Sequence, residues 1–201
     1  MAGTHSRIRD NIIQAAVELF REQGYDNVSV NAICKRAYVA HSSFYYLFSG
    51  KQEIIECLLR DVRENEQQLT EALLFASNDF ERMWTICCRY LDVALRLGPE
   101  ITASLMKLEL SGSLRSLEYV HAVDSWFIRF TENCLRQGIM RTGMPAEFVA
   151  VFGIDAVYKL VYDWCAQKGA FNLRRRAREV SEALYDLAPE YRMSEQEKAN
   201  L

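Results

Sequence analysis

The sequence contains few of the residues that interrupt helices. It has 3 prolines and 9 glycines in 201 residues, and both are scarcer than in an average globular protein. It also lacks strand-like runs, in which apolar and polar residues alternate between turn residues. Long helices with short connections are therefore expected.

The residue clusters that metal sites and most enzymes need are absent too. None of the six cysteines forms a CxxC pair, no Cys/His run has zinc-ligand spacing, and only three histidines are present. No glycine-rich phosphate loop and no Ser/His/Asp arrangement is recognisable. We therefore expect no cofactor, no metal and no enzymatic activity. The cysteines are interpreted as reduced, buried small apolar residues, with a redox-sensing pair as the alternative.

No uncharged apolar run reaches about 18 residues, the minimum for a transmembrane helix, and the N-terminus has no apolar signal core. The expected location is cytoplasmic, without contact to a membrane. The net charge of −3 excludes a basic field over the whole protein, so any contact with nucleic acid must be local.

Apolar residues recur at helical spacing along most of the chain. In residues 6–23, for example, Ile8, Ile12 and Leu19 share one face. The spacing predicts further helices at residues 30–36, 40–46, 51–75, 79–97, 99–110, 116–140, 145–167 and 173–187. The predicted fold is all-α with about nine helices, and the polar residues 189–201 are expected to fray.

Residues 30–46 have the pattern of a helix-turn-helix motif. Two short helices with a brief break follow an amphipathic helix, and Ser29 can cap the first of them. The second must enter the major groove of DNA, so its outer face needs small or hydrogen-bonding side chains. The residues available there are His41, Ser42, Ser43, Tyr45 and Tyr46.

The charge of this segment also suits DNA. Residues 1–51 hold six basic and four acidic side chains, a balance of +2, whereas the rest of the chain carries −5. Lys51 stands at a helix start, where a cation and free backbone N–H groups bind phosphate well.

Short motifs follow one another through the same segment: Ala-x-Glu-Leu-Phe (Ala16–Phe20), Gly24-Tyr25, Ser-Val-x-x-Ile (Ser29–Ile33), Ala-x-Val (Ala37–Val39), Phe44-Tyr45-Tyr46-x-Phe48 and Lys51-x-Glu53. In this order and spacing, the stretch from residue 12 to 55 resembles the N-terminal domain of the TetR family. The resemblance implies a three-helix DNA-binding head. It also implies phosphate contacts by Ser29, Ser43, Tyr45 and Lys51. The side chains implied to approach base edges are His41 and Ser42, with Tyr46 as a further candidate.

Some positions depart from the residues usual in that family. Tyr38 stands where Gly is usual, and a left-handed conformation would cost a tyrosine about 1 kcal/mol or more. Either the turn differs, or Tyr38 gains a compensating contact with the DNA backbone. Ala40 replaces the usual Ser cap of the second short helix. His41 replaces a frequent Lys, and Leu47 a frequent His.

The last two predicted helices resemble the pair that forms a four-helix dimer interface in this family. The helix at 145–167 is apolar around much of its circumference, so it must be buried on more than one side. Core packing alone would explain this, but we expect contact with a second copy in addition. The predicted interface is Phe148, Phe152, Val157, Val161, Trp164, Val180 and Leu184.

Aromatic and sulfur-bearing residues are dense between residues 79 and 167. Such residues suit the lining of a site for an apolar or aromatic small-molecule effector, although ordinary core packing would explain each one singly. The predicted lining is Trp84, Tyr90, Met106, Trp126, Phe127, Phe130, Tyr158 and Tyr162.

The sequence thus predicts a DNA-binding domain at residues 1–50, a helical effector-binding and dimerisation domain at 51–188, and a polar tail at 189–201. The leading hypothesis is a homodimeric repressor that binds an approximately palindromic operator in double-stranded DNA and is released by a small-molecule effector. The alternative is a helical dimeric interaction protein of the same fold with weakened DNA binding.

Overall fold

The computed structural model describes residues 2–63, 66–112 and 118–201, and every regular element in this part of the chain is helical. The first elements are α1 (Ala2–Gln23), the 3₁₀ turn η1 (Tyr25–Asn27), α2 (Val30–Ala37), α3 (His41–Leu47) and α4 (Lys51–Arg63). The later ones are α5 (Glu66–Phe75), α6 (Asp79–Leu97), α7 (Pro99–Leu110), α8 (Glu118–Arg136), α9 (Ala146–Ala166), α10 (Leu173–Leu184), η2 (Pro189–Tyr191) and α11 (Glu195–Ala199).

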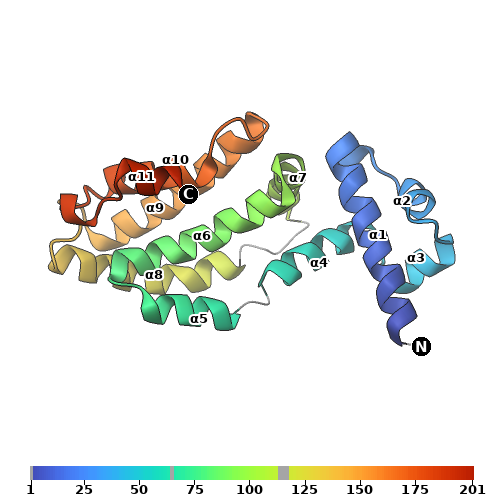
Figure 1. Cartoon of the computed structure of the whole chain (residues 1–201), viewed down its shortest axis with the longest axis horizontal. Coiled ribbons are helices and arrows are strands. Elements are labelled where there is room, and N and C mark those ends of the chain that lie inside the picture. Colours follow the sequence, from blue (N-terminus) through green and yellow to red (C-terminus); the bar gives the residue numbers. More distant parts are fainter. Residues whose placement is uncertain (1, 64–65, 113–117) are drawn as a thin grey trace.

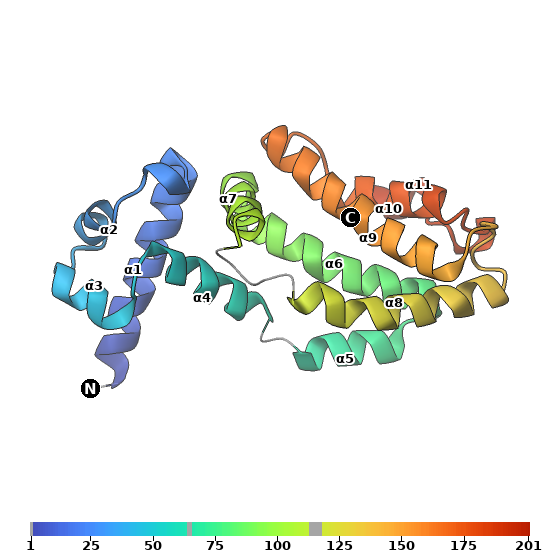
Figure 2. The same ribbon diagram turned by 180° about the vertical axis from the view of Figure 1, so that it is seen from behind.

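The helices form two groups along an elongated molecule. Figure 1 shows α1, α2 and α3 together at one end, with α4 leading away from them. We call α1–α3 with η1 the head, and α5–α11 the body. Seen from behind in Figure 2, α6, α8 and α9 lie side by side along the body.

The predicted all-α fold is confirmed, and two predicted helices coincide with α6 and α7. These two meet at Gly98, whose φ of 82° ends α6. Pro99 then begins α7 at the position where its missing N–H costs nothing. The region predicted as one helix at 51–75 contains α4 and α5, and the prediction for residues 64–65 between them lies outside the described residues.

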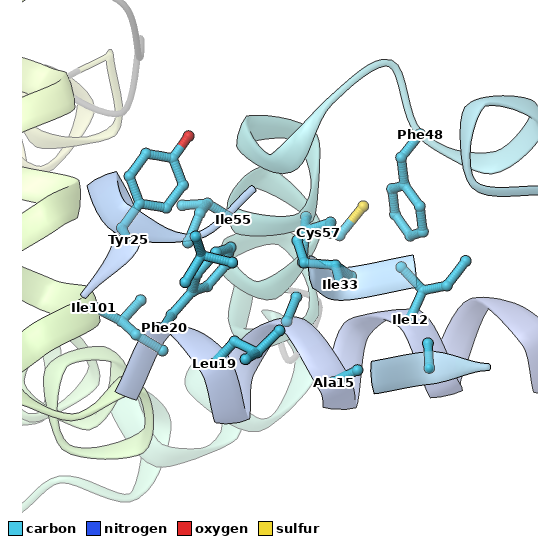
Figure 3. Packing of buried hydrophobic residues seen from close by; sticks show 14 of the residues in the cluster. Ile12, Ala15, Leu19, Phe20, Tyr25, Ile33, Phe48, Ile55, Cys57 and Ile101 are labelled. Carbon is cyan, nitrogen blue, oxygen red and sulfur yellow. The ribbon is translucent and has the colours of Figure 1, made fainter. Parts of the chain in front are cut away.

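The core of the head includes side chains from the body. Ile12 and Phe20 on α1 are fully buried, in a cluster that α2, α3 and the first turns of α4 complete. Leu97, Ile101 and Leu105 belong to the same cluster, and Figure 3 shows Ile101 entering it from α7. The head and the α6–α7 corner of the body therefore share one core.

Polar contacts cross the same joint. The guanidinium of Arg21 donates to the backbone carbonyl of Arg96 at 3.0 Å. Lys107 on α7 forms an ion pair with Asp26 in η1, and this hydrogen bond holds the pKa of Asp26 below its ordinary value.

In the body, a buried arginine ties α10 to α6. The side chain of Arg178 is 1% exposed and donates to the carboxylates of Glu81 at 2.8 Å and Glu182 at 2.9 Å. Its guanidinium also lies over the rings of Phe80 and Trp84. Because a buried charge is costly unless it is paired, these contacts fix the relative positions of the two helices.

The network continues into the last residues of the chain. Glu182 accepts a hydrogen bond from the Met193 N–H at 2.8 Å and forms an ion pair with Lys198 at 2.9 Å. α11 itself begins with a capping box. The expectation that residues 189–201 fray is therefore wrong, because the burial of Glu182 makes partners on this segment necessary.

We predict that acid unfolding is linked to Glu182. Burial favours its protonated form, but the Met193 N–H, Lys198 and Arg178 together favour the anion more, so the pKa of Glu182 lies below its ordinary value. Such a carboxyl adds stability above its unfolded-state pKa of about 4.3, and this stability is lost as the pH falls through the folded-state pKa. The free energy of unfolding in urea should therefore fall more steeply below about pH 4.5 in the wild type than in Glu182→Gln.

At pH 7 the Glu182→Gln variant should already be destabilised by about 2–4 kcal/mol, because Arg178 and Lys198 lose a charged partner. Glu147→Gln, at an exposed site on α9, is the matched control and should follow the wild-type profile. Parallel pH profiles for wild type and Glu182→Gln would refute the link.

Candidate nucleic-acid interface

The turn between α2 and α3 has the geometry of a helix-turn-helix. The Ser29 hydroxyl accepts a hydrogen bond from the Ala32 N–H at 3.1 Å and caps α2, as predicted. The Val39 N–H donates to the Cys34 carbonyl at 3.0 Å and closes the turn. α3 begins at His41, and its N-cap residue, Ala40, provides no side-chain cap, as expected from the replacement of the usual Ser.

Tyr38 occupies the left-handed position of this turn. Its φ is 56° and its ψ is 43°, so the turn keeps the conformation that glycine adopts freely, and the alternative of a different turn is excluded. The Tyr38 residue is 96% exposed. Packing within the chain therefore does not offset the cost of about 1 kcal/mol for this conformation.

Four predicted residues lie exposed on one side of α3: His41, Ser42, Tyr45 and Tyr46. Tyr45 is 55% exposed and Tyr46 is 76% exposed. Ser43 is half-buried, and Phe44 is fully buried on the opposite side, in the head core. The helix thus presents hydroxyls, an imidazole and aromatic rings to the surroundings.

Asn31 on α2 also reaches this surface, and the sequence analysis missed it. Its Oδ1 lies 3.3 Å from Nε2 of His41, and the His41 ring centroid lies 5.9 Å from that of Tyr45. Asn31 and Lys35 are four residues apart on α2, so they share one side of it. The sequence shows that this side of α2 is polar, but no sequence pattern indicates the contact between Asn31 and His41 on α3.

Lys51, which is predicted to contact a phosphate, makes its hydrogen bonds within the protein. Its Nζ donates to the carbonyls of Tyr25, Asp26 and Val28 at 2.7, 3.3 and 2.9 Å, and partial burial lowers its pKa. An ammonium has three donors, so none remains for a phosphate in this arrangement. Lys51 instead joins η1 to the start of α4.

Two of the five Lys and Arg residues of the head, Arg21 and Arg36, are also engaged within the protein. Arg36 makes a bidentate pair with Glu22 and reaches Glu18, which clamps α2 to α1. The hydrogen bond from Arg36 lowers the pKa of Glu22. Among the described residues, the Lys and Arg side chains of the head that make no ion pair or hydrogen bond are Arg7, Arg9 and Lys35.

The residues predicted for a dimer interface divide into two groups. Phe148 and Phe152 are 54% and 48% exposed, and their rings stack with planes 11° apart. Val157, Val161 and Trp164 are buried in the core of the protomer itself, where they pack with residues of α6 and α10. The structure thus places these three side chains in the protomer core, whereas Phe148 and Phe152 lie at its surface.

The exposed apolar side of α9 extends beyond the predicted residues. Val151 is 49% exposed and Tyr162 is 57% exposed, with Nζ of Lys159 at 5.6 Å from the Tyr162 ring centroid. On the neighbouring α10, Val180 and Leu184 are half-buried.

The residues predicted to line an effector site fall into three groups in the structure. One group packs together in the body: Trp84, Tyr90, Met106 and Tyr158. Burial and the neighbouring Tyr158 raise the pKa of Tyr90 above its ordinary value. A second group, Phe127 and Phe130 on α8, belongs to a separate hydrophobic cluster of the body. The remaining two residues, Trp126 and Tyr162, are each 57% exposed.

Within the described residues, no group of His, Cys, Asp or Glu side chains is arranged to hold a metal ion. No helix described here is long and apolar enough to cross a membrane. The six cysteines are free thiols, and burial raises the pKa of Cys87 and Cys134 to about 12.

The exposed polar helix of a helix-turn-helix, mounted on a larger helical body, defines the class of protein. Residues 12–58 match the family model described as bacterial regulatory proteins, tetR family. Over these residues the head has the N-terminal domain of the TetR family of bacterial regulatory proteins.

Known proteins resemble the chain over different lengths. The uncharacterized HTH-type transcriptional regulator YvdT of Bacillus subtilis (strain 168) is 28% identical over 117 residues, which cover 58% of this chain and 56% of that protein. The chain thus spans about half the length of this relative.

Two solved structures show the same fold. The MbdR regulator from Azoarcus sp. CIB has a TM-score of 0.66 at 15% identity, covering 90% of this chain and 98% of that one. FadR from Bacillus subtilis, in complex with stearoyl-CoA, has a TM-score of 0.63 at 20% identity, covering 87% and 96%.

We predict that Tyr38→Gly stabilises the protein. Glycine removes a left-handed strain of about 1–2 kcal/mol but gains freedom in the unfolded chain that costs about 0.5–1 kcal/mol. The net increase in the free energy of unfolding should therefore be about 0.5–1 kcal/mol. Tyr38→Ala, which keeps the strain, is the control and should show no increase in urea unfolding. Equal stabilities of the two variants would mean that Tyr38 is not strained.

Proposed function

We propose that the chain is a homodimeric, DNA-binding repressor whose two heads read the half-sites of an approximately palindromic operator in double-stranded DNA. The observation that carries this proposal is the outer side of α3, where hydroxyl-bearing and aromatic residues stay exposed while the opposite side is anchored in the core. In a helix-turn-helix this side faces the major groove. Residues 1–50 are the DNA-binding part in this proposal, and 51–188 bind the effector and the second copy.

The exposed residues of the turn and α3 take different roles. The hydroxyls of Ser29, Ser43 and Tyr45 donate to phosphates, which sets the register of the head on DNA. His41 and Ser42 approach base edges, as does Tyr46. Tyr38 reaches the DNA backbone, and this contact compensates for its strained conformation.

A dimer through α9 and α10 places two heads on one DNA. The stacked Phe148 and Phe152, together with Val151, leave an apolar strip exposed on α9. Tyr162 extends this strip along the same helix, and Val180 lies on the neighbouring α10. In a two-fold dimer each residue of such a strip is used twice, once by each copy.

We predict that Phe152→Asp dissociates the dimer. A carboxylate in an apolar interface loses its hydration, and symmetry doubles the cost, so the dimer dissociation constant should rise at least about 100-fold. Sedimentation equilibrium measures this constant. Phe75→Asp, at an 86% exposed site on α5, is the matched control and should remain dimeric. If Phe152→Asp stays dimeric as well, the interface lies elsewhere.

The proposed effector is a small molecule with a large apolar part. The aromatic and sulfur-bearing residues Trp84, Tyr90, Met106 and Tyr158 lie together in the body, and aromatic and apolar side chains are the common lining of such sites. The likeness of the fold to FadR, solved in complex with stearoyl-CoA, supports the same class of ligand. An effector releases DNA only if its affinity differs between the bound and released arrangements.

We predict that selection from a random double-stranded DNA library enriches a palindrome. If Arg7, Arg9 and Lys35 contact phosphates in both heads, the logarithm of the affinity should fall with the logarithm of salt concentration at a slope of about −5. Lys35→Ala should reduce the magnitude of this slope by about 2 per dimer. Addition of stearoyl-CoA in the same assay tests release by an apolar effector.

Three variants test whether the head binds DNA through the turn and α3. Tyr45→Phe and Tyr38→Gly keep the head folded and should each weaken binding by about fivefold, the worth of one hydrogen bond. Arg129→Ala, at an exposed site on α8 in the body, should leave both the affinity and the salt slope unchanged. Unchanged binding by both head variants would rule out this docking of α3.

A second candidate function is an interaction protein of the same fold with weakened DNA binding. The observation that favours it is the engagement of Lys51, Arg36 and Arg21 within the protein, which leaves few cations for phosphates. It predicts a folded dimer that enriches no DNA sequence and binds DNA only weakly at physiological salt. The library selection distinguishes the two candidates.

A further inference from the structure

We propose that Asn31 is a positioning residue for DNA readout. By holding one ring nitrogen of His41, it fixes the imidazole in the form that selects adenine or cytosine. This inference rests on the proposed function, because His41 selects a base only if α3 enters the major groove.

In the protein without DNA, the imidazole of His41 already contacts two other side chains, Asn31 and Tyr45. Asn31 on α2 contacts its Nε2 through Oδ1 at 3.3 Å. The ring of Tyr45, one turn further along α3, lies at a centroid distance of 5.9 Å and a tilt of 51°. A side chain that is already ordered loses less conformational entropy on binding. The His41 ring is therefore suited to reading a base.

The contact with Asn31 decides which nitrogen of His41 carries the proton. An amide oxygen only accepts hydrogen bonds, so Nε2 must be the donor. In the neutral imidazole the other nitrogen, Nδ1, is then an acceptor. Nδ1 has no hydrogen-bond partner among the described residues, and His41 is exposed. This acceptor remains available to DNA.

An acceptor on the protein distinguishes the bases in the major groove. Adenine and cytosine present an amino group there, whereas guanine and thymine present carbonyl oxygens at the corresponding positions. His41 held by Asn31 therefore accepts from adenine or cytosine and is repelled by guanine or thymine. We expect about a fivefold preference at one position of each half-site, the worth of one hydrogen bond.

Without Asn31, both neutral forms of His41 become accessible. The form with a proton on Nδ1 donates to guanine or thymine, so the discrimination at this position disappears. In Asn31→Ala the preference should fall to less than about twofold, and the affinity for the best operator should fall by no more than about fivefold. The exposed Asn31 side chain caps no helix and lies outside the head core, so the variant should fold.

The experiment combines two measurements at pH 8, above the usual titration range of imidazoles. The first is selection from a DNA library with wild type, Asn31→Ala and Lys35→Ala. Lys35 lies one turn along α2 on the same side, and its loss should weaken all sequences alike. The second is the ¹⁵N spectrum of the histidine rings in the free protein, with His41→Gln to assign the signal.

In the ¹⁵N spectrum, the His41 ring should be protonated at Nε2 in the wild type and should be a mixture of the two neutral tautomers in Asn31→Ala. In the library selection, the preference for adenine or cytosine should be lost in Asn31→Ala and kept in Lys35→Ala. An unchanged ring form or an unchanged preference in Asn31→Ala would overturn it while leaving the proposed function intact. A wild type that enriches no sequence at all would overturn both.

Discussion

The packing of Leu97, Ile101 and Leu105 into the core of the head is the constraint on which the rest of the molecule depends. Burying an aliphatic side chain of this size contributes about 1.5–3 kcal/mol. The exposed ion pair of Lys107 with Asp26 adds little by comparison. Since protein cores are densely packed and deform poorly, α7 cannot shift without moving the head or opening a gap. The orientation of the head is therefore set by the body, and not by the connection through α4 alone.

The body in turn behaves as one packed unit. Arg178 joins α10 to α6 through two carboxylates, and Glu182 extends the same network to the C-terminal residues. The apolar strip proposed for dimerisation lies on α9, which packs against both helices. The distance between two heads in such a dimer would follow from the packing of each protomer. An effector could then change that distance only by preferring a second packing of the body.

The sequence indicated those features that depend on a few neighbouring residues. The Gly98–Pro99 junction and the cap at Ser29 were predicted because glycine, proline and serine act locally on the backbone. The hydrogen bonds of Lys51 within the protein could not be foreseen, because the carbonyls to which it donates are more than twenty residues away in the sequence. The burial of Val157 and Trp164 in the protomer core could not be foreseen either, because α9 is apolar on several sides. Periodicity alone does not tell which side meets the protomer core and which could meet a second copy.

Few Lys and Arg side chains near the exposed side of α3 remain available for contacts with DNA phosphates. Three cationic side chains stabilise the fold by donating hydrogen bonds to carboxylates and carbonyls within the protein: Arg36, Arg21 and Lys51. Since non-specific binding to DNA is mostly electrostatic, a head with few available cations would gain little from random sequences. The affinity of the head for DNA would then depend on contacts made by its hydroxyl groups and aromatic rings and on contacts with base edges. Only DNA with a matching sequence and shape provides these contacts. The proposed contact of the strained, exposed Tyr38 with the DNA backbone would follow the same principle, because only DNA that fits the head would offset the cost of its conformation.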